Sequence, residues 1–176
     1  ALTDAVKDGV VARNVVEAVT SPRKSTKEMV TLTPSQLGLL LEASEATHYG
    51  NLIFAAAHTG LRRGELVGLK WTDVDLERGT LSVQRSAGRI PGRGLVVTEP
   101  KTSKGRRQID LGAELVGVLR AQRARQAEER LAAGPAWQDE GWVFPKRDGT
   151  CSDPDVVSHS FHSLVGKLGL PPTRLH

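Results

Sequence analysis

Apolar residues recur at helical spacing through most of the chain and change to an alternating pattern near its middle. Leu37, Leu40 and Leu41 lie at i, i+3 and i+4, the spacing of one helix face. Thr33 and Pro34 precede them as an N-cap and a first-turn proline. Similar patterns predict helices over residues 1–19, from 33 onward, over about 47–57, from 61 to about 70, over 112–132 and from 154 to about 168. The chain is therefore expected to be mainly helical.

From Gly79 onward the apolar period falls to two, which is typical of strands. The alternating segments are Thr80–Gln84, Leu95–Thr98 and Arg106–Leu111. Because glycine-rich connections separate them, they predict a small three-stranded antiparallel sheet. Trp142–Phe144 is expected to be a short extended piece. The fold class that follows is α+β, with this sheet packed beside a helical core.

Two further expectations concern burial and boundaries. In the helix over 112–132, the apolar side should be formed by Leu115, Val118, Leu119 and Leu131.

Residues 1–20 form at most one short helix, which cannot bury itself alone. They are either the end of an upstream domain or a strap across the next one. Residues 21–32 are polar and basic and include a proline, so they indicate a linker before the main domain at 33–176.

Composition narrows the class of protein. With 39% hydrophobic and 4% aromatic residues, the chain should have an aliphatic core. No apolar run approaches the length of a membrane span, and the first residues lack the order of a signal peptide. The single cysteine, Cys151, cannot form an internal disulfide. Together these features indicate a cytoplasmic protein.

Positive charge is concentrated from the end of the first predicted strand to the start of the third. The region from Arg85 to Arg107 carries seven cations and one anion, a local charge of +6 in a chain of net charge +4. The cations are Arg85, Arg89, Arg93, Lys101, Lys104, Arg106 and Arg107. Such a cluster suits a polyanion, because each neutralised phosphate releases counterions. The alternative is a solvated basic hairpin without a partner.

Arg62 is the most informative candidate in the segment Thr59–Glu65. On a helix beginning at Leu61, it would share a face with Glu65, whereas Arg63 would point elsewhere. A cation in the first turn opposes the helix dipole, so local helix stability does not explain it. Glu65 could hold the guanidinium and leave its outer edge free for a phosphate. The alternative is an arginine–glutamate pair that only ties helices together.

No metal site is expected. His159 and His162 lie at i and i+3 on a predicted helix, but no third ligand accompanies them. Tyr49, the only tyrosine, is expected to pack against neighbouring helices.

Three segments in order resemble the tyrosine recombinases of the phage integrase family. Residues 59–75, TGLRRGELVGLKWTDVD, are similar to the family's first arginine box. Residues 99–111, EPKTSKGRRQIDL, resemble its lysine-bearing β-hairpin, and residues 170–176, LPPTRLH, resemble the approach to its second box. The resemblance covers nearly the whole chain. It implies that residues 1–20 are the last helix of a core-binding domain and residues 33–176 a catalytic domain.

The resemblance also implies roles for individual residues. Arg62 would clamp the scissile phosphate with Glu65 as its support. Lys101 would be the general acid that protonates the departing 5′ oxygen, while Lys104 would contact a backbone phosphate. His176 would be the first histidine of the second box. The remaining DNA contacts are expected from Arg63, Arg85, Arg89, Arg93, Arg106 and Arg107. Because Arg106 and Arg107 alternate across a strand, only one of these two can face DNA.

The expected activity is site-specific cutting and rejoining of double-stranded DNA through a 3′-phosphotyrosyl link, without metal or other cofactor. The family's second arginine, later histidine or tryptophan and nucleophilic tyrosine would follow position 176, so this stretch alone is expected to be inactive. The intact protein is expected to act as a homotetramer on paired sites, as an integrase of a mobile element. Two alternatives are a non-catalytic DNA-binding module of the same fold and a relative of type IB topoisomerases.

Overall fold

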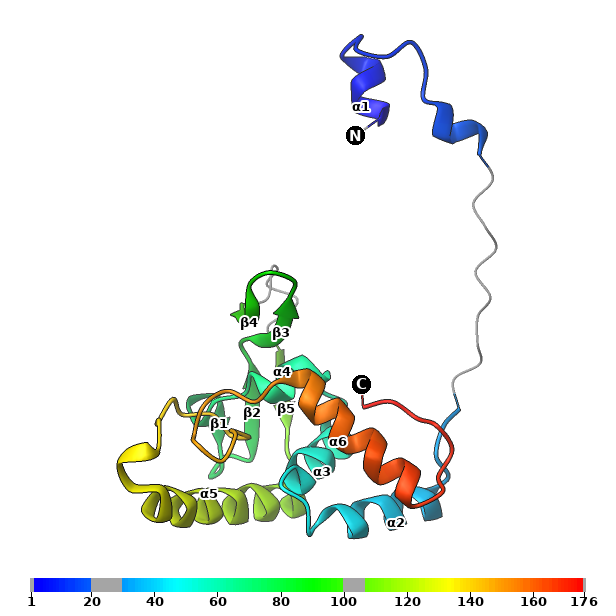
Figure 1. Cartoon of the computed structure of the whole chain (residues 1–176). Coiled ribbons are helices and arrows are strands. Elements are labelled where there is room, and N and C mark those ends of the chain that lie inside the picture. The colour runs from blue at the N-terminus through cyan, green and yellow to red at the C-terminus, as the bar shows by residue number, and fades with distance from the viewer. Residues whose placement is uncertain (1, 20–29, 100–106, 176) are drawn as a thin grey trace.

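The computed structural model describes residues 2–19, 30–99 and 107–175, and Figure 1 shows how their helices and strands are arranged. The elements in chain order are α1 (Leu2–Lys7), η1 (Val15–Ala18), α2 (Pro34–Ser44), α3 (Gly50–Thr59), α4 (Arg63–Val67), η2 (Trp71–Asp73), β1 (Val74–Asp75), β2 (Thr80–Val83), β3 (Ser86–Ile90), β4 (Gly94–Thr98), β5 (Arg107–Asp110), α5 (Ala113–Ala133), η4 (Gly134–Ala136) and α6 (Pro154–Lys167). None of the helices in these ranges is long and apolar enough to cross a membrane.

The longer helices confirm the sequence pattern. Thr33 caps α2 by accepting a hydrogen bond from the backbone N–H of Gln36, and Oε1 of Gln36 accepts one from the backbone N–H of Thr33. This reciprocal capping satisfies two N–H groups at the helix start. Helix α3 ends at Gly60, whose φ of 62° lies in the left-handed region that glycine tolerates.

Residues 1–19 and 61–70 are less helical than predicted. In the first segment only α1 and the single 3-10 turn η1 form, and neither buries a side chain among the described residues. In the second segment α4 spans only five residues, because it begins after Arg62, whose backbone is extended, and ends at the Gly68 C-cap. The prediction of one continuous helix from Leu61 to about Lys70 was therefore wrong.

A three-stranded antiparallel sheet is present, but its strands differ from those predicted. Its order is β1-β2-β5, and β3 and β4 form a separate antiparallel hairpin. Residues 95–98 therefore pair with β3 and not with residues 80–83. Strand β3 contains Ser86 and Gly88, which are poor strand formers, so the alternating pattern did not reveal it. In Figure 1 this hairpin lies beside α4, at the end of the domain away from α2 and α5.

The core consists of two clusters that meet at α3. The larger is built around Leu52, Leu66, Leu115 and Val143 and joins α3, α4 and α5 to the sheet. The smaller contains Leu40, Ile53, Phe161 and Val165 and joins α2, α3 and α6. Leu175 packs against both clusters, so the segment after α6 folds back onto the domain.

The buried side of α5 continues with amides and not with leucine. Leu115 and Leu119 are buried as predicted, but Leu131 is 83% exposed. Gln122 and Gln126 are buried and donate hydrogen bonds to the carbonyl of Val143. These bonds satisfy backbone carbonyl groups of the extended Trp142–Phe144 segment. Hydrophobic spacing does not reveal that these carbonyls require buried donors.

Candidate functional site

Arg62 lies at the turn that leads from α3 into α4. It is the N-cap of α4, with extended backbone angles φ −67° and ψ 149°. The predicted helical face shared by Arg62 and Glu65 is therefore absent. Instead, the backbone N–H of Arg62 donates to Oε2 of Glu65 at 2.8 Å. This carboxylate cap brings the two residues together, since Glu65 occupies the N3 position from which a carboxylate reaches back.

Glu65 is the buried centre of the site. Its side chain is only 9% exposed, and it joins the Arg62 turn to the first residue of β5. Arg107 grips it with two parallel hydrogen bonds, Nη1 to Oε1 at 3.0 Å and Nη2 to Oε2 at 2.8 Å. These bonds, followed by the backbone N–H of Arg62, lower the pKa of Glu65 despite its burial. The carboxylate is therefore ionised, and the same pair raises the pKa of Arg107.

The Arg62 guanidinium is held weakly and faces solvent. Its side chain is 71% exposed, and its hydrogen bond runs from Nη1 to Oε1 of Glu65 at 3.3 Å. A guanidinium has five N–H donors, so most of them remain available to a phosphate.

Arg63, the adjacent arginine, is used inside the molecule. Its Nη1 donates to Oγ of Ser158 at 2.6 Å and to Oδ1 of Asp155 at 3.3 Å. Both partners lie on α6, so Arg63 ties α4 to that helix. Its predicted contact with DNA would have to compete with these bonds.

Glycine at position 64 permits the hairpin to pack on α4. A Cβ there would lie 2.5 Å from Oγ of Ser86 and 2.6 Å from the carbonyl oxygen of Ala87. No side chain fits at such distances. The glycine of the arginine box therefore fixes the base of β3 beside the Arg62 turn.

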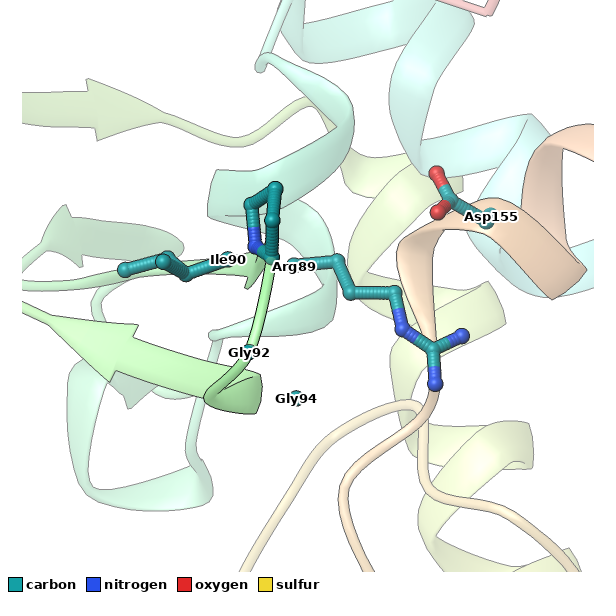
Figure 2. Close-up of a pocket in the computed structure, with 6 residues that line it drawn as sticks. Arg89, Ile90, Gly92, Gly94 and Asp155 are labelled. Atoms are coloured by element: carbon teal, nitrogen blue, oxygen red, sulfur yellow. The ribbon is translucent and has the colours of Figure 1, made fainter.

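The described cations of the basic region differ in their partners. Arg85 forms a short ion pair with Asp73, and Arg89 pairs with Asp153 at 3.1 Å. Figure 2 shows the Arg89 side chain reaching from β3 toward the start of α6, beside an open hollow that Asp155 also lines. Arg93, in the β3–β4 turn, forms no ion pair with any residue in the described ranges.

Four of the predicted site residues, Lys101, Lys104, Arg106 and His176, lie outside the described residues. Tyr49 is 8% exposed and packs in the larger core cluster, as predicted. His159 and His162 are both exposed, and no group of three or more potential metal ligands occurs within the described ranges.

Sequence reasoning named Glu65 but missed Asp73 and Asp153, the carboxylates that bind Arg85 and Arg89. Asp73 caps η2 by accepting from the backbone N–H of Lys70 at 2.8 Å, as Glu65 caps α4 three residues after Arg62. Asp153 caps α6 through the backbone N–H of Asp155. An acidic residue at the N-cap or three residues beyond it was the available signal for a capping carboxylate. Each of these carboxylates also binds an arginine, which comes from β5, from the link between β2 and β3, or from β3.

Comparison with known proteins gives consistent results across sequence and structure. The family model "Phage integrase family" matches residues 30–176. A XerC-like tyrosine recombinase of Caldanaerobacter subterraneus is 30% identical over 98% of this chain and 48% of its own length. An integrase of Streptomyces ambofaciens is 34% identical over 88% of the chain and 41% of its own length.

Among solved structures, the fold resembles that of the Tn1549 transposon integrase in complex with transposon right end DNA. The TM-score is 0.79 at 23% identity, over 99% of this chain and 59% of the other. The chain thus spans about half the length of the relatives that it matches. Because the family model matches residues 30–176, this chain belongs to the phage integrase family.

Proposed function

We propose that the protein is a site-specific tyrosine recombinase that cuts and rejoins double-stranded DNA to integrate or excise a mobile element. The observation that carries this proposal is the Arg62 guanidinium, which is anchored at one edge by a buried carboxylate and otherwise exposed to solvent. Such a preorganised cation suits the charge that builds on the non-bridging oxygens of a phosphate under attack.

The remaining catalytic roles rest on the family resemblance. Lys101 would donate a proton to the departing 5′ oxygen, Lys104 would contact a backbone phosphate, and His176 would act near the attacking oxygen. Leu175, which precedes His176, is anchored against both core clusters, and this supports a role for the segment in the same domain.

The nucleophile would be a tyrosine located after position 176. Its hydroxyl would give up its proton, with His176 helping that transfer, and its oxygen would bond to phosphorus as the bond to the 5′ oxygen breaks. Lys101 would supply the proton that the leaving oxygen takes. Tyr49 is unsuitable, because it is buried in the core. The phosphotyrosyl link would conserve the energy of the broken phosphodiester bond, so resealing of the DNA strand would need neither metal nor nucleotide cofactor.

DNA would be held by the hairpin arginines, Arg89 and Arg93, together with Lys104 and Arg106. Arg85 is 23% exposed and paired with Asp73, so it would contact DNA only at the expense of that pair. The intact protein would assemble as a homotetramer on paired sites, in the cytoplasm at the nucleoid. Residues 33–176 would form its catalytic domain, and residues 1–20 the last helix of the core-binding domain.

The test uses the protein at its natural full length and a nicked suicide DNA substrate, which traps the covalent intermediate. We expect a protein–DNA adduct from the unsubstituted protein. Arg62→Ala should lower the cleavage rate by about 1,000-fold with little change in DNA affinity. Arg130→Ala is the matched control, because Arg130 lies near the end of α5 and forms an exposed ion pair with Asp139. Absence of any adduct under binding conditions would refute the proposal.

A further inference from the structure

Arg107 was expected from the sequence to contact DNA, but the structure gives it a different partner. Both of its terminal nitrogens are bound to Glu65, in the fork geometry that matches a carboxylate. Arg107 begins β5 and Glu65 lies on α4, so this ion pair connects two elements 42 positions apart in the chain. A guanidinium committed in this way is poorly placed to bind a phosphate as well.

The bonds to Glu65 use the full capacity of its carboxylate. Oε1 accepts from Arg62 Nη1 and Arg107 Nη1, and Oε2 accepts from the Arg62 backbone and Arg107 Nη2. Each carboxylate oxygen has two lone pairs, so four hydrogen bonds saturate the carboxylate. Of the two guanidinium groups, Arg107 holds the shorter bonds and Arg62 only the bond at 3.3 Å.

We infer that Arg107 is a positioning residue that saturates Glu65 and thereby keeps the Arg62 guanidinium turned outward for the scissile phosphate. Without Arg107, a buried carboxylate would have one cation left, and Arg62 would move inward to bind it through two nitrogens. The donors of Arg62 and its net positive charge would then be lost to the DNA. This inference rests on the proposed function for its catalytic consequence, but the orientation of Arg62 can be measured without catalysis.

The catalytic experiment compares Arg107→Met with Arg62→Ala in full-length protein on the suicide substrate. We expect Arg107→Met to slow cleavage of bound DNA by about 100-fold. The slope of log affinity against log salt should stay unchanged, because no phosphate contact is removed. A slope reduced by about one, with cleavage of bound DNA intact, would make Arg107 a phosphate ligand and overturn the inference.

A second substitution separates capture of Arg62 from simple damage to the fold. Arg107→Met/Glu65→Gln keeps an amide oxygen for the Arg62 backbone but removes the charge that draws the guanidinium inward. We expect the double variant to cleave faster than Arg107→Met alone, and Arg107→Lys to lie between Arg107→Met and the unsubstituted protein. If the double variant were as slow as the single one or slower, Arg107 would act only through stability. Thermal unfolding confirms that each variant is folded.

Chemical modification tests the inference independently of the proposed function. Phenylglyoxal reacts with solvent-accessible guanidinium groups, and mass spectrometry can follow Arg62 without DNA present. Arg62 should react more slowly in Arg107→Met than in the unsubstituted protein, whereas Arg130 should react equally in both. An unchanged rate at Arg62 would refute the inference even if the protein cleaves DNA. If the unsubstituted protein forms no adduct but Arg62 is protected as described, the proposed function fails and the positioning role stands.

Discussion

The Arg62 turn and the β3–β4 hairpin both present arginines, but they hold them in opposite ways. At the turn, the Glu65 carboxylate is only 9% exposed and binds the guanidinium groups of Arg62 and Arg107 in one hydrogen-bonded set. On the hairpin, Arg89 pairs with Asp153 while remaining 58% exposed, and Arg93 lies exposed at the tip. The turn therefore suits one phosphate at a fixed position, whereas the hairpin suits a backbone whose phosphates are bound one by one.

The two regions pack closely where α4 meets β3, and substitution of Gly64 at this contact should have the largest effect on stability. Gly64→Ala places a Cβ 2.6 Å from the carbonyl oxygen of Ala87, which belongs to backbone and cannot rotate away. We expect the free energy of unfolding to fall by about 3 kcal/mol, as for overpacked cores. Urea unfolding followed by tryptophan fluorescence measures it.

The matched control for Gly64→Ala is the same change at Gly117. This glycine lies inside α5, and a Cβ there meets no atom within 4 Å. Because alanine favours a helix over glycine, Gly117→Ala should raise the free energy of unfolding by about 1 kcal/mol. If the two substitutions changed stability alike, the close contact between α4 and β3 would not be what requires glycine at position 64.

The next largest effect concerns the charge on Glu65 and should depend on pH. Since folding lowers the pKa of Glu65, its stabilising contribution is complete above the ordinary glutamate value and is lost as pH falls through the lowered one. Glu65→Gln should cost about 2 kcal/mol of unfolding free energy at pH 7. The two proteins should converge in stability only when the pH falls below the lowered pKa of Glu65, and not at the ordinary glutamate value. A difference that stayed constant with pH would mean that the carboxylate's shape, and not its charge, matters.

How far the sequence predicted the site depends on whether local or distant residues position it. The capping pattern placed α2, and the arginine box identified Arg62 and Glu65 as partners. Their geometry was wrong, however, because a helical face was assumed where the chain makes a capped turn. The pairing of Arg107 with Glu65 was not predictable, since hydrophobic period carries no information on which strand faces which helix end. Charge concentration likewise did not reveal that Asp73 already binds Arg85 and that Asp153 already binds Arg89.

The exposed ion pair between Arg89 and Asp153 should contribute little to stability. The Arg89 side chain is 58% exposed, so water screens the pair. Arg89→Ala is expected to change the free energy of unfolding by about 0.5 kcal/mol or less, measured by urea unfolding. A loss comparable with that of Glu65→Gln would erase the distinction between the two regions.

The smallest expected effect on stability, and the clearest on DNA binding, belongs to Arg93. Its side chain is exposed in the turn and forms no ion pair within the described ranges, so Arg93→Ala should leave the free energy of unfolding unchanged.

If Arg93 binds one phosphate, the slope of log affinity against log salt should fall by about one in Arg93→Ala. Filter binding or fluorescence anisotropy on duplex DNA at several salt concentrations measures this slope. Arg130→Ala, on the distant end of α5, should leave it unchanged. An unaltered slope in Arg93→Ala would show that the hairpin tip does not reach DNA, and the contrast with the Arg62 turn would then be one between a binding site and a solvated loop.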